Sequence, residues 1–400
     1  YMINMCIPNK VILWGNDNYN TLGVLRMLSK CNIDIFFLIN NKKRHCASKS
    51  RYFKKHYVVK SIDAGIKYLI DNFKEESCKT ILICTSDLIA EAVDNNKEKL
   101  SQFLFISCVS DGLRLEDILD KNKMTSLAKE CGLNVPYSRR ITKNDFSTDF
   151  QYPCIIKPNK NRVNHKKEFK SFICNNPEEL NEIMIKVNND SEFILQQYIK
   201  KKYEILIYGC RLKNGDVFIP GCFLKDRWLH GGDATHGLIT RKIPTIINIK
   251  AIEKFLQSIG YYGLFSVEFG VENDKAYFYE FNLRNDGTSH YFFPAGVNLP
   301  YLYVLDCIGN KYNTEDFEVK KDVFFIDEIG DKTNIDGLSL SKKQWKDDLK
   351  KSLAFKLYDK HDPCPYYWAY VFNNIYTNAI KKMIKTFLLL LTKKKWKNQI

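Results

Sequence analysis

The stretch LFSVEFGVENDKAYFYEFNLRNDG, residues 264–287, reads as two short strands joined by a turn. Alternation separates the side chains of the first strand into two faces: Phe265, Val267 and Phe269 against Ser266, Glu268 and Gly270. In the second strand, alternation groups Ala276, Phe278, Glu280 and Asn282 on one face. The turn signal is Asn273-Asp274-Lys275, so the sequence predicts a β-hairpin folded about Asp274.

The predicted hairpin sets Glu268 opposite Glu280. Directly opposed residues lie about 4.5–5.5 Å apart at Cβ, where like charges repel, so the pair requires a cation or a shared proton. Asn282 adds a third oxygen, and such a set suits a hard cation such as Mg²⁺. Arg284 follows the strand, where it would hold an anion beside the cation. Either glutamate alone is more simply a solvated strand residue, but the pair followed by Asn-x-Arg-x-x-Gly favours a phosphate-plus-magnesium site.

Length and charge narrow the class of protein. Four hundred residues exceed one comfortable core and predict two or three domains. The net charge of +15 indicates an anionic partner: nucleic acid, an anionic membrane surface, or a substrate such as a nucleotide. Because no RNA-binding aromatic signature or zinc-finger spacing is present, nucleic acid is not expected. Thirteen cysteines without a CxxC pair predict a reduced, cytoplasmic compartment, and no signal peptide is visible.

Residues 1–118 alternate between strand and helix patterns. Apolar runs at 11–14, 33–39, 80–84 and 103–106 are separated by helical stretches at 21–30, 61–73 and 87–100. This order predicts a parallel α/β sheet of Rossmann type. Gly15 and Gly23 do not form the GxGxxG fingerprint, so no dinucleotide site is expected in this domain.

Several later segments occur in an informative order. They are a helix at 117–131 containing Asp120–Lys123, the strand YPCIIKP at 152–158, the strand ending in QQYI at 196–199, Glu204, VEFG at 267–270 and EFNLRNDG at 280–287. This order resembles that of ATP-grasp ligases. The first domain, with GNDNYNTLGVLRML at 15–28, is similar to the pre-ATP-grasp domain of carbamoyl-phosphate-synthase-like ligases. The resemblance covers roughly residues 10–310 and implies an ATP-grasp domain at 119–310, with a small lid subdomain near 150–200.

The resemblance implies roles for individual residues. Lys123 and Lys157 would hold ATP phosphates, the segment Gln196, Gln197, Tyr198 and Ile199 would contact adenine, and Glu204 would take the ribose hydroxyls. Glu268, Glu280 and Asn282 would bind Mg²⁺, or Mn²⁺, and Arg284 would steady the transferring phosphoryl group. A simple alternative for each lysine is a solvated surface position among 61 basic residues.

Two departures from the family pattern are visible. The phosphate-covering loop of the family is usually rich in glycine, because backbone N–H groups must approach the phosphates closely. Here residues 159–171 are NKNRVNHKKEFKS, without a glycine, and Leu283 stands where the family commonly has proline.

The segment from Lys225 to Arg241 looks like the stretch that lies over the acceptor site in carboxylate–amine ligases. Lys225, Arg227, His230 and Arg241 are its candidates for contacting substrate, and Arg241 joins Arg284 as a candidate catalytic residue. The alternative is a polar surface loop with a charge cluster.

Residues 311–400 resemble no known unit. Residues 311–360 read as a small α/β appendage with a helix at 341–357, and lysines accumulate after Asp362 among aromatic and leucine residues. Residues 366–400 therefore predict a basic amphipathic helix, which would either lie on an anionic membrane surface or pack on its own domain.

The combined expectation is an α/β (α+β) protein: a Rossmann-like first domain, an ATP-grasp fold of two α+β subdomains, and a C-terminal basic helical appendage. The implied activity is amide formation between a carboxylate and an amine through an acyl phosphate, on a cell-envelope or polysaccharide precursor if the protein is peripheral on the inner face of the membrane. The alternatives are a carbamoyl-phosphate-type reaction with bicarbonate, and a binding or scaffold protein on a degenerate ATP-grasp fold. Relatives of this type are often homodimers.

Overall fold

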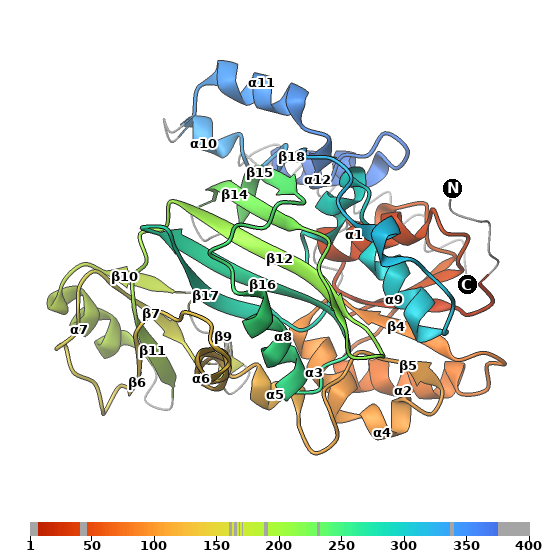
Figure 1. Cartoon of the computed structure of the whole chain (residues 1–400), viewed down its shortest axis with the longest axis horizontal. Coiled ribbons are helices and arrows are strands. Elements are labelled where there is room, and N and C mark those ends of the chain that lie inside the picture. The colour runs from red at the N-terminus through yellow and green to blue at the C-terminus, as the bar shows by residue number, and fades with distance from the viewer. Residues whose placement is uncertain are drawn as a thin grey trace, which may run out of the picture.

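The computed structural model describes residues 7–40, 46–159, 162–163, 166–167, 169, 171–187, 191–229, 233–336 and 340–374. Three sheets of four or more strands organise this part of the chain (Figure 1). A five-stranded parallel sheet comes from the N-terminal part, a four-stranded antiparallel sheet follows it, and the largest sheet contains the hairpin at 263–282. The fold is thus of the α/β class, as the sequence predicts.

The N-terminal sheet has the order β3-β2-β1-β4-β5, with every neighbouring pair parallel. Its strands are buried on both faces, since Leu13 packs into one core and Trp14 into another. The sequence missed only the edge strand β3, whose side chains are mostly exposed and carry no apolar run. The elements are β1 Val11–Gly15, α1 Tyr19–Leu28, β2 Ile35–Ile39, the 3₁₀ helix η1 Ala47–Lys49, β3 Lys55–Val58, α2 Ile62–Phe73, β4 Thr80–Cys84, α3 Asp87–Asn95, α4 Lys97–Leu100 and β5 Leu104–Phe105.

The four-stranded sheet has the order β10-β7-β11-β6 and packs against α7. It is reached through α6, which begins after Asp120 because the aspartate carboxylate accepts hydrogen bonds from the backbone N–H groups of Asn122 and Lys123. The elements are α5 Leu115–Ile118, α6 Lys121–Cys131, β6 Ser138–Thr142, β7 Cys154–Pro158, the paired strands β8 Arg162–Val163 and β9 Lys166–Lys167, β10 Phe172–Cys174, α7 Pro177–Lys186 and β11 Glu192–Gln197.

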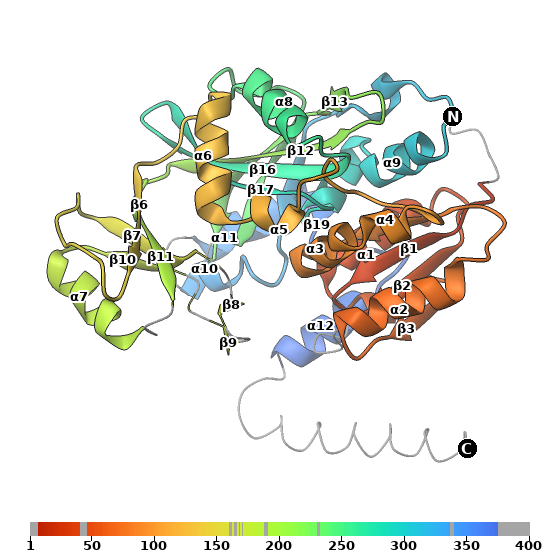
Figure 2. The same cartoon turned by 90° about the horizontal axis from the view of Figure 1, so that it is seen from below.

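The largest sheet has the order β17-β16-β12-β14-β15-β18-β19, with β13 paired to β12. One face packs on α6 and α8, which Figure 2 shows side by side, and the other packs on α9 and α1. The elements are β12 Tyr203–Arg211, β13 Val217–Phe218, β14 Cys222–Trp228, β15 Ala234–Thr240, α8 Ile249–Ser258, β16 Gly263–Glu272, β17 Lys275–Asn282, η2 Ser289–Ala295, α9 Leu299–Cys307, η3 Thr314–Phe317, β18 Val323–Ile326, α10 Thr333–Asp336, α11 Lys342–Lys351, β19 Ala354–Phe355 and α12 Cys364–Asn374.

Residues 311–360 extend the largest sheet. β18 pairs with β15, and β19 pairs with β18 in parallel, so the sheet continues across the predicted domain boundary at 310. The helix predicted at 341–357 is shorter, because α11 ends at Lys351 and a strand follows. The basic helix predicted at 366–400 lies outside the described residues beyond Asn374. Within the described part, no helix is long and apolar enough to cross a membrane.

Candidate functional site

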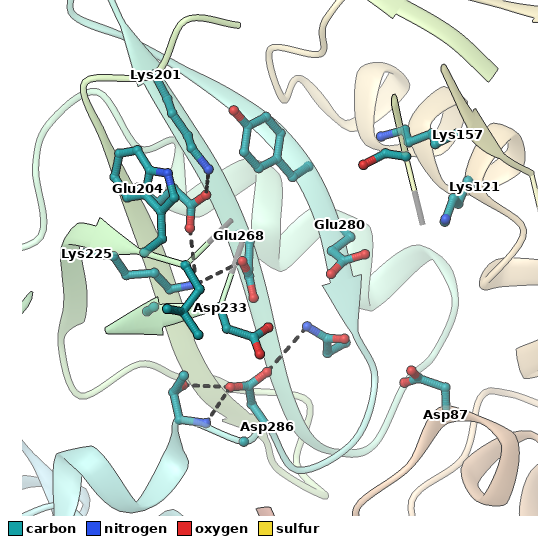
Figure 3. A pocket seen from close by; sticks show the side chains of 18 of the residues that line it. Asp87, Lys121, Lys157, Lys201, Glu204, Lys225, Asp233, Glu268, Glu280 and Asp286 are labelled. Atoms are coloured by element: carbon teal, nitrogen blue, oxygen red, sulfur yellow. Dashed lines mark hydrogen bonds and ion pairs between the residues drawn. The ribbon is translucent and has the colours of Figure 1, made fainter. Parts of the chain in front are cut away.

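A cleft of about 1100 Å³ opens where the three sheets meet, and Figure 3 shows its charged lining. Eleven of the residues proposed from the sequence line it together: Lys157, Gln196, Gln197, Tyr198, Ile199, Glu204, Lys225, Glu268, Glu280, Asn282 and Arg284. They lie on β7, β11, β12, β14 and the hairpin β16–β17, except that Tyr198 and Ile199 follow β11 and Arg284 follows β17. The structure therefore assembles most of the predicted set in one cavity.

The hairpin reaches the predicted pairing of Glu268 with Glu280 through a β-bulge. The turn is one residue tighter than expected, with Asn273 and Asp274 both at positive φ and Glu272 opposite Lys275. A register irregularity after Glu268 then realigns the strands. The prediction that Ala276, Phe278, Glu280 and Asn282 share one face of the strand is wrong because of this bulge. Ala276 and Phe278 face the core, whereas Glu280 and Asn282 face the cleft.

Glu268 is part of a buried charge chain. The Lys225 ammonium lies 2.9 Å from a Glu268 oxygen and 3.5 Å from Glu204 Oε2. Burial, and then the nearby charge of Glu280, raise the pKa of Glu268 to about 7, although Lys225 acts in the opposite direction. Burial acts against the ammonium of Lys225, but Glu268 and Glu204 outweigh it and raise the pKa of this lysine. Lys225 is thus a buried cation that lines the cleft and is already paired within the protein, and its contact with a substrate stays a prediction.

The sequence proposes Glu268, Glu280 and Asn282 as the ligands of a divalent cation. Burial and the nearby charge of Glu280 act against the negative charge of Glu268, and a bound divalent cation would offset this cost. Asn282 donates to Ser266 Oγ at 3.2 Å, and its oxygen accepts from Arg284 at 2.9 Å. Among the described residues no three His, Cys, Asp or Glu side chains are grouped to hold a metal. The donor set is therefore two carboxylates and one amide oxygen, and it fits a hard cation that also takes ligands from a phosphate.

Arg284 is paired within the protein. Its guanidinium lies 2.7 Å from Asp87 Oδ1 and 3.7 Å from Asp286 Oδ2. Burial opposes the charge, but Asp87 and Asp286 outweigh burial and raise the pKa of Arg284. Because Asp87 opens α3, Arg284 joins the hairpin to the N-terminal sheet as well as facing the cleft.

The structure separates the two lysines that the resemblance had grouped. Lys157 stands on β7 in the cleft, where burial and the nearby Lys121 lower its pKa to about 8. Lys123 instead is exposed, does not line the cleft and pairs with Asp117 at 2.7 Å. Lys121, the first residue of α6, takes the cleft position that the sequence assigned to Lys123. The helix start at Asp120 is the signal that would have identified it.

Residues 196–204 carry the predicted nucleotide contacts. Gln196 and Gln197 pair with Ile155 and Cys154 across the small sheet, and the chain then leaves that sheet for β12. Glu204 lines the cleft and is buried: its Oε1 accepts from Lys201, and its Oε2 makes no hydrogen bond but lies 3.5 Å from the Lys225 ammonium. The carboxylate is therefore already ion-paired within the protein, and its contact with the ribose stays a prediction.

Two further candidates, Arg227 and Arg241, do not line the cleft. Arg241 is exposed and pairs with Glu318 at 2.5 Å, and Arg227 is held by Asp331 and Asp348, each at 2.9 Å. Both arginines satisfy acidic groups of the C-terminal part, which the sequence reasoning did not consider. His230 lies outside the described residues, as does much of the glycine-free loop 159–171.

The cleft also contains residues that sequence reasoning missed. Tyr19, Asp87, Asp233, Asp286 and Lys356 all line it. Tyr19 and Asp87 directly follow β1 and β4, and ligands bind outside the carboxyl ends of parallel strands where the strand order reverses. That reversal lies between β1 and β4 here, so the order of strands contained the signal.

Comparison with known proteins identifies the domain. Residues 126–296 match the model of the ATP-grasp domain. The L-amino acid ligase of Bacillus licheniformis is similar in structure, with TM-score 0.60, 16% identity and 79% of each chain covered. N5-carboxyaminoimidazole synthetase from Staphylococcus aureus, complexed with ADP, gives TM-score 0.61 and 17% identity, covering 82% of this chain and 86% of that one.

A third similar structure is the biotin carboxylase domain of the Hydrogenobacter thermophilus 2-oxoglutarate carboxylase, determined with MgADP and bicarbonate. It has TM-score 0.57 and 18% identity, and covers 79% of this chain and 73% of that one. No curated protein sequence matches the chain. These identities show a shared fold. The chain therefore contains an ATP-grasp domain at residues 126–296, preceded by a parallel sheet.

Proposed function

We propose that this protein is an ATP-dependent, ADP-forming ligase that joins a carboxylate to an amine through an acyl phosphate. The observation that supports it best is the register pair Glu268 and Glu280, which faces Lys157 across one cleft. Carboxylates for a divalent cation and lysines for phosphates are the two elements that phosphoryl transfer requires. The ADP and MgADP complexes of two similar structures agree with this reading.

Different residues of the cleft would have different roles in the proposed reaction. Lys157 and Lys121 would contact the phosphates of ATP, and the carboxylate of Glu204, which also lines the cleft, would accept from a ribose hydroxyl. Glu268, Glu280 and Asn282 would hold Mg²⁺, or Mn²⁺, whose charge neutralises the phosphoryl oxygens. The substrate carboxylate attacks the γ-phosphorus and ADP leaves; the amine then attacks the acyl carbon, phosphate leaves, and the amine loses one proton.

The test measures ADP and phosphate release with Mg-ATP and pools of carboxylates and amines, including bicarbonate. Glu280→Gln should lower the rate on the order of 10²–10³-fold, because one carboxylate of the cation site is lost. Glu253→Gln, an exposed glutamate on α8, is the matched control and should retain the wild-type rate. Release that persists in Glu280→Gln would refute the assignment of the cation site.

A binding protein on the same fold is the second candidate. The pairing of Arg284 with Asp87 favours it, because this guanidinium is already occupied. Such a protein would be stabilised against heat by Mg-ATP or by an anionic partner, yet would release no ADP with any pool. The predicted homodimer, and the predicted contact of residues 366–400 with an anionic membrane, stay predictions.

A further inference from the structure

The end of the cleft near the N-terminal sheet has its own chemistry. Loops following β1 and β4 meet the hairpin there, and Tyr19 and Thr288 line it together with Asp233 and Lys356. This is the switch point of the parallel sheet, where α/β folds bind ligands. Tyr19 and Lys356 lie outside the segment 126–296 that matches the domain model, so the ATP-grasp assignment does not account for them.

Lys356 is held in place from several sides. Its backbone N–H donates to Glu328 at 3.0 Å, and the Nε2 of His290 lies 3.1 Å from its carbonyl oxygen. Its ammonium donates to Asp327 at 2.8 Å and lies 4.7 Å from the centre of the Tyr19 ring. A lysine fixed in this way loses little further side-chain entropy on binding a ligand, and two of its three N–H donors remain for an anionic group.

Asp233 provides the opposite charge. Its side chain is exposed in the cleft, where Figure 3 labels it, and makes no hydrogen bond or ion pair with the described residues. Burial raises the pKa of Tyr19, with Lys356 lowering it and Asp233 raising it. Both charges therefore act on the same phenol, so a cation, a carboxylate and an aromatic ring lie near one another at this end of the cleft.

We propose that this end of the cleft is the acceptor site, and that it selects a zwitterion of the α-amino acid type. The ligand's carboxylate would bind the Lys356 ammonium, and its amino group would bind Asp233, packed against Tyr19. Asp233 orients the amino group and accepts a hydrogen bond from it. The inference rests on the proposed ligase function, and it adds the class of the amine substrate.

The experiment compares two forms of the same acceptor in the ADP-release assay: free amino acids, and their carboxamides, which keep the nucleophilic amine and lose only the carboxylate. For the wild-type protein, kcat/KM should be about 10- to 100-fold higher for the free amino acids than for the carboxamides, since the carboxamide loses one charged contact. Lys356→Met should remove this preference. Asp233→Asn should lower kcat/KM for the free amino acids by a similar factor.

Controls separate this inference from the ligase proposal. Lys356→Arg keeps the charge and should restore most of the preference, whereas Lys351→Met changes an exposed lysine and should behave as wild type. An unchanged preference in Lys356→Met, or equal rates for amino acids and carboxamides, would overturn the acceptor assignment alone. Stabilisation by Mg-ATP without release for any amino acid would also overturn it. Absence of both stabilisation and release would overturn the ligase proposal as well.

Discussion

The positions of the acidic residues on the hairpin β16–β17 and of the lysines around it are determined in different ways. Glu268, Glu280 and Asn282 come from one hairpin, and their relation depends on local pairing and a single bulge. The cations come from β7, from the start of α6 and from β14, and each reaches the cleft only through the packing of three sheets. The two glutamates of the hairpin are thus placed by local pairing, whereas Lys157, Lys121 and Lys225 are placed by the tertiary fold.

Removing Lys225, which pairs with both Glu204 and Glu268, should have the largest effect, and that effect is on stability. Lys225→Met should lower the free energy of unfolding by about 3–5 kcal/mol at pH 8, because Glu204 and Glu268 would lose their shared buried cation. Urea unfolding measures the change. Lys202→Met alters an exposed lysine directly before β12, the strand that carries Glu204, and should stay within about 0.5 kcal/mol. A loss below about 1 kcal/mol in Lys225→Met would mean that the two carboxylates do not depend on this lysine.

The second prediction uses the pKa of Glu268, which is about 7 in the folded protein. A divalent cation requires the ionised carboxylate, so the affinity for Mg²⁺ with nucleotide should fall about tenfold from pH 8 to pH 6. Titration calorimetry measures it, and Glu268→Gln should bind weakly with a flatter pH dependence. Without ligand the sign reverses: the folded state keeps a proton that the unfolded chain has lost, so this group lowers stability as pH rises from about 4.5 to 7. Equal pH dependence in wild type and variant would contradict the assignment.

The smallest expected effect is a difference in Mg-ATP affinity between variants of Lys121 and Lys123. Lys121→Met should weaken binding of Mg-ATP about fivefold, because a half-buried cation at the cleft is lost. Lys123→Met should leave the affinity within about twofold, because Lys123 pairs with Asp117 on the surface. The opposite order would restore the residue that the family pattern suggested and would show that α6 turns when nucleotide binds.

The fold could be predicted from the sequence where apolar runs are long and separated by helices. The N-terminal sheet was predicted this way except for β3, because an exposed edge strand carries no hydrophobic run. β18 and β19 were missed for a different reason, since short strands that complete a distant sheet have no local partner to reveal them. The helix at 341–357 was extended too far for the same reason.

In the candidate site, too, contacts set by local pairing could be predicted, and contacts set by the tertiary fold could not. The Glu268–Glu280 pair was predicted because cross-strand register follows from a turn and from alternation, and the bulge offsets the tighter turn. Lys225, Arg227 and Arg241 were proposed from the resemblance of their segment and from their charge, and each has an acidic partner far away in the sequence. Lys356 and Tyr19 were not proposed at all, because their proximity depends on the tertiary fold.

One contact outside the sheets and the cleft determines how far the chain can be shortened. Arg26, buried in α1, donates to the carboxylate and the backbone oxygen of Asp362 and to the carbonyl oxygen of Leu357. These hydrogen bonds therefore join α1, near the beginning of the described chain, to residues 357–362, near its end. A shortened version that stops soon after the ATP-grasp segment would leave this guanidinium buried without acceptors. Residues up to 362 belong to the smallest unit that should fold, and domain dissection has to treat both ends as one piece.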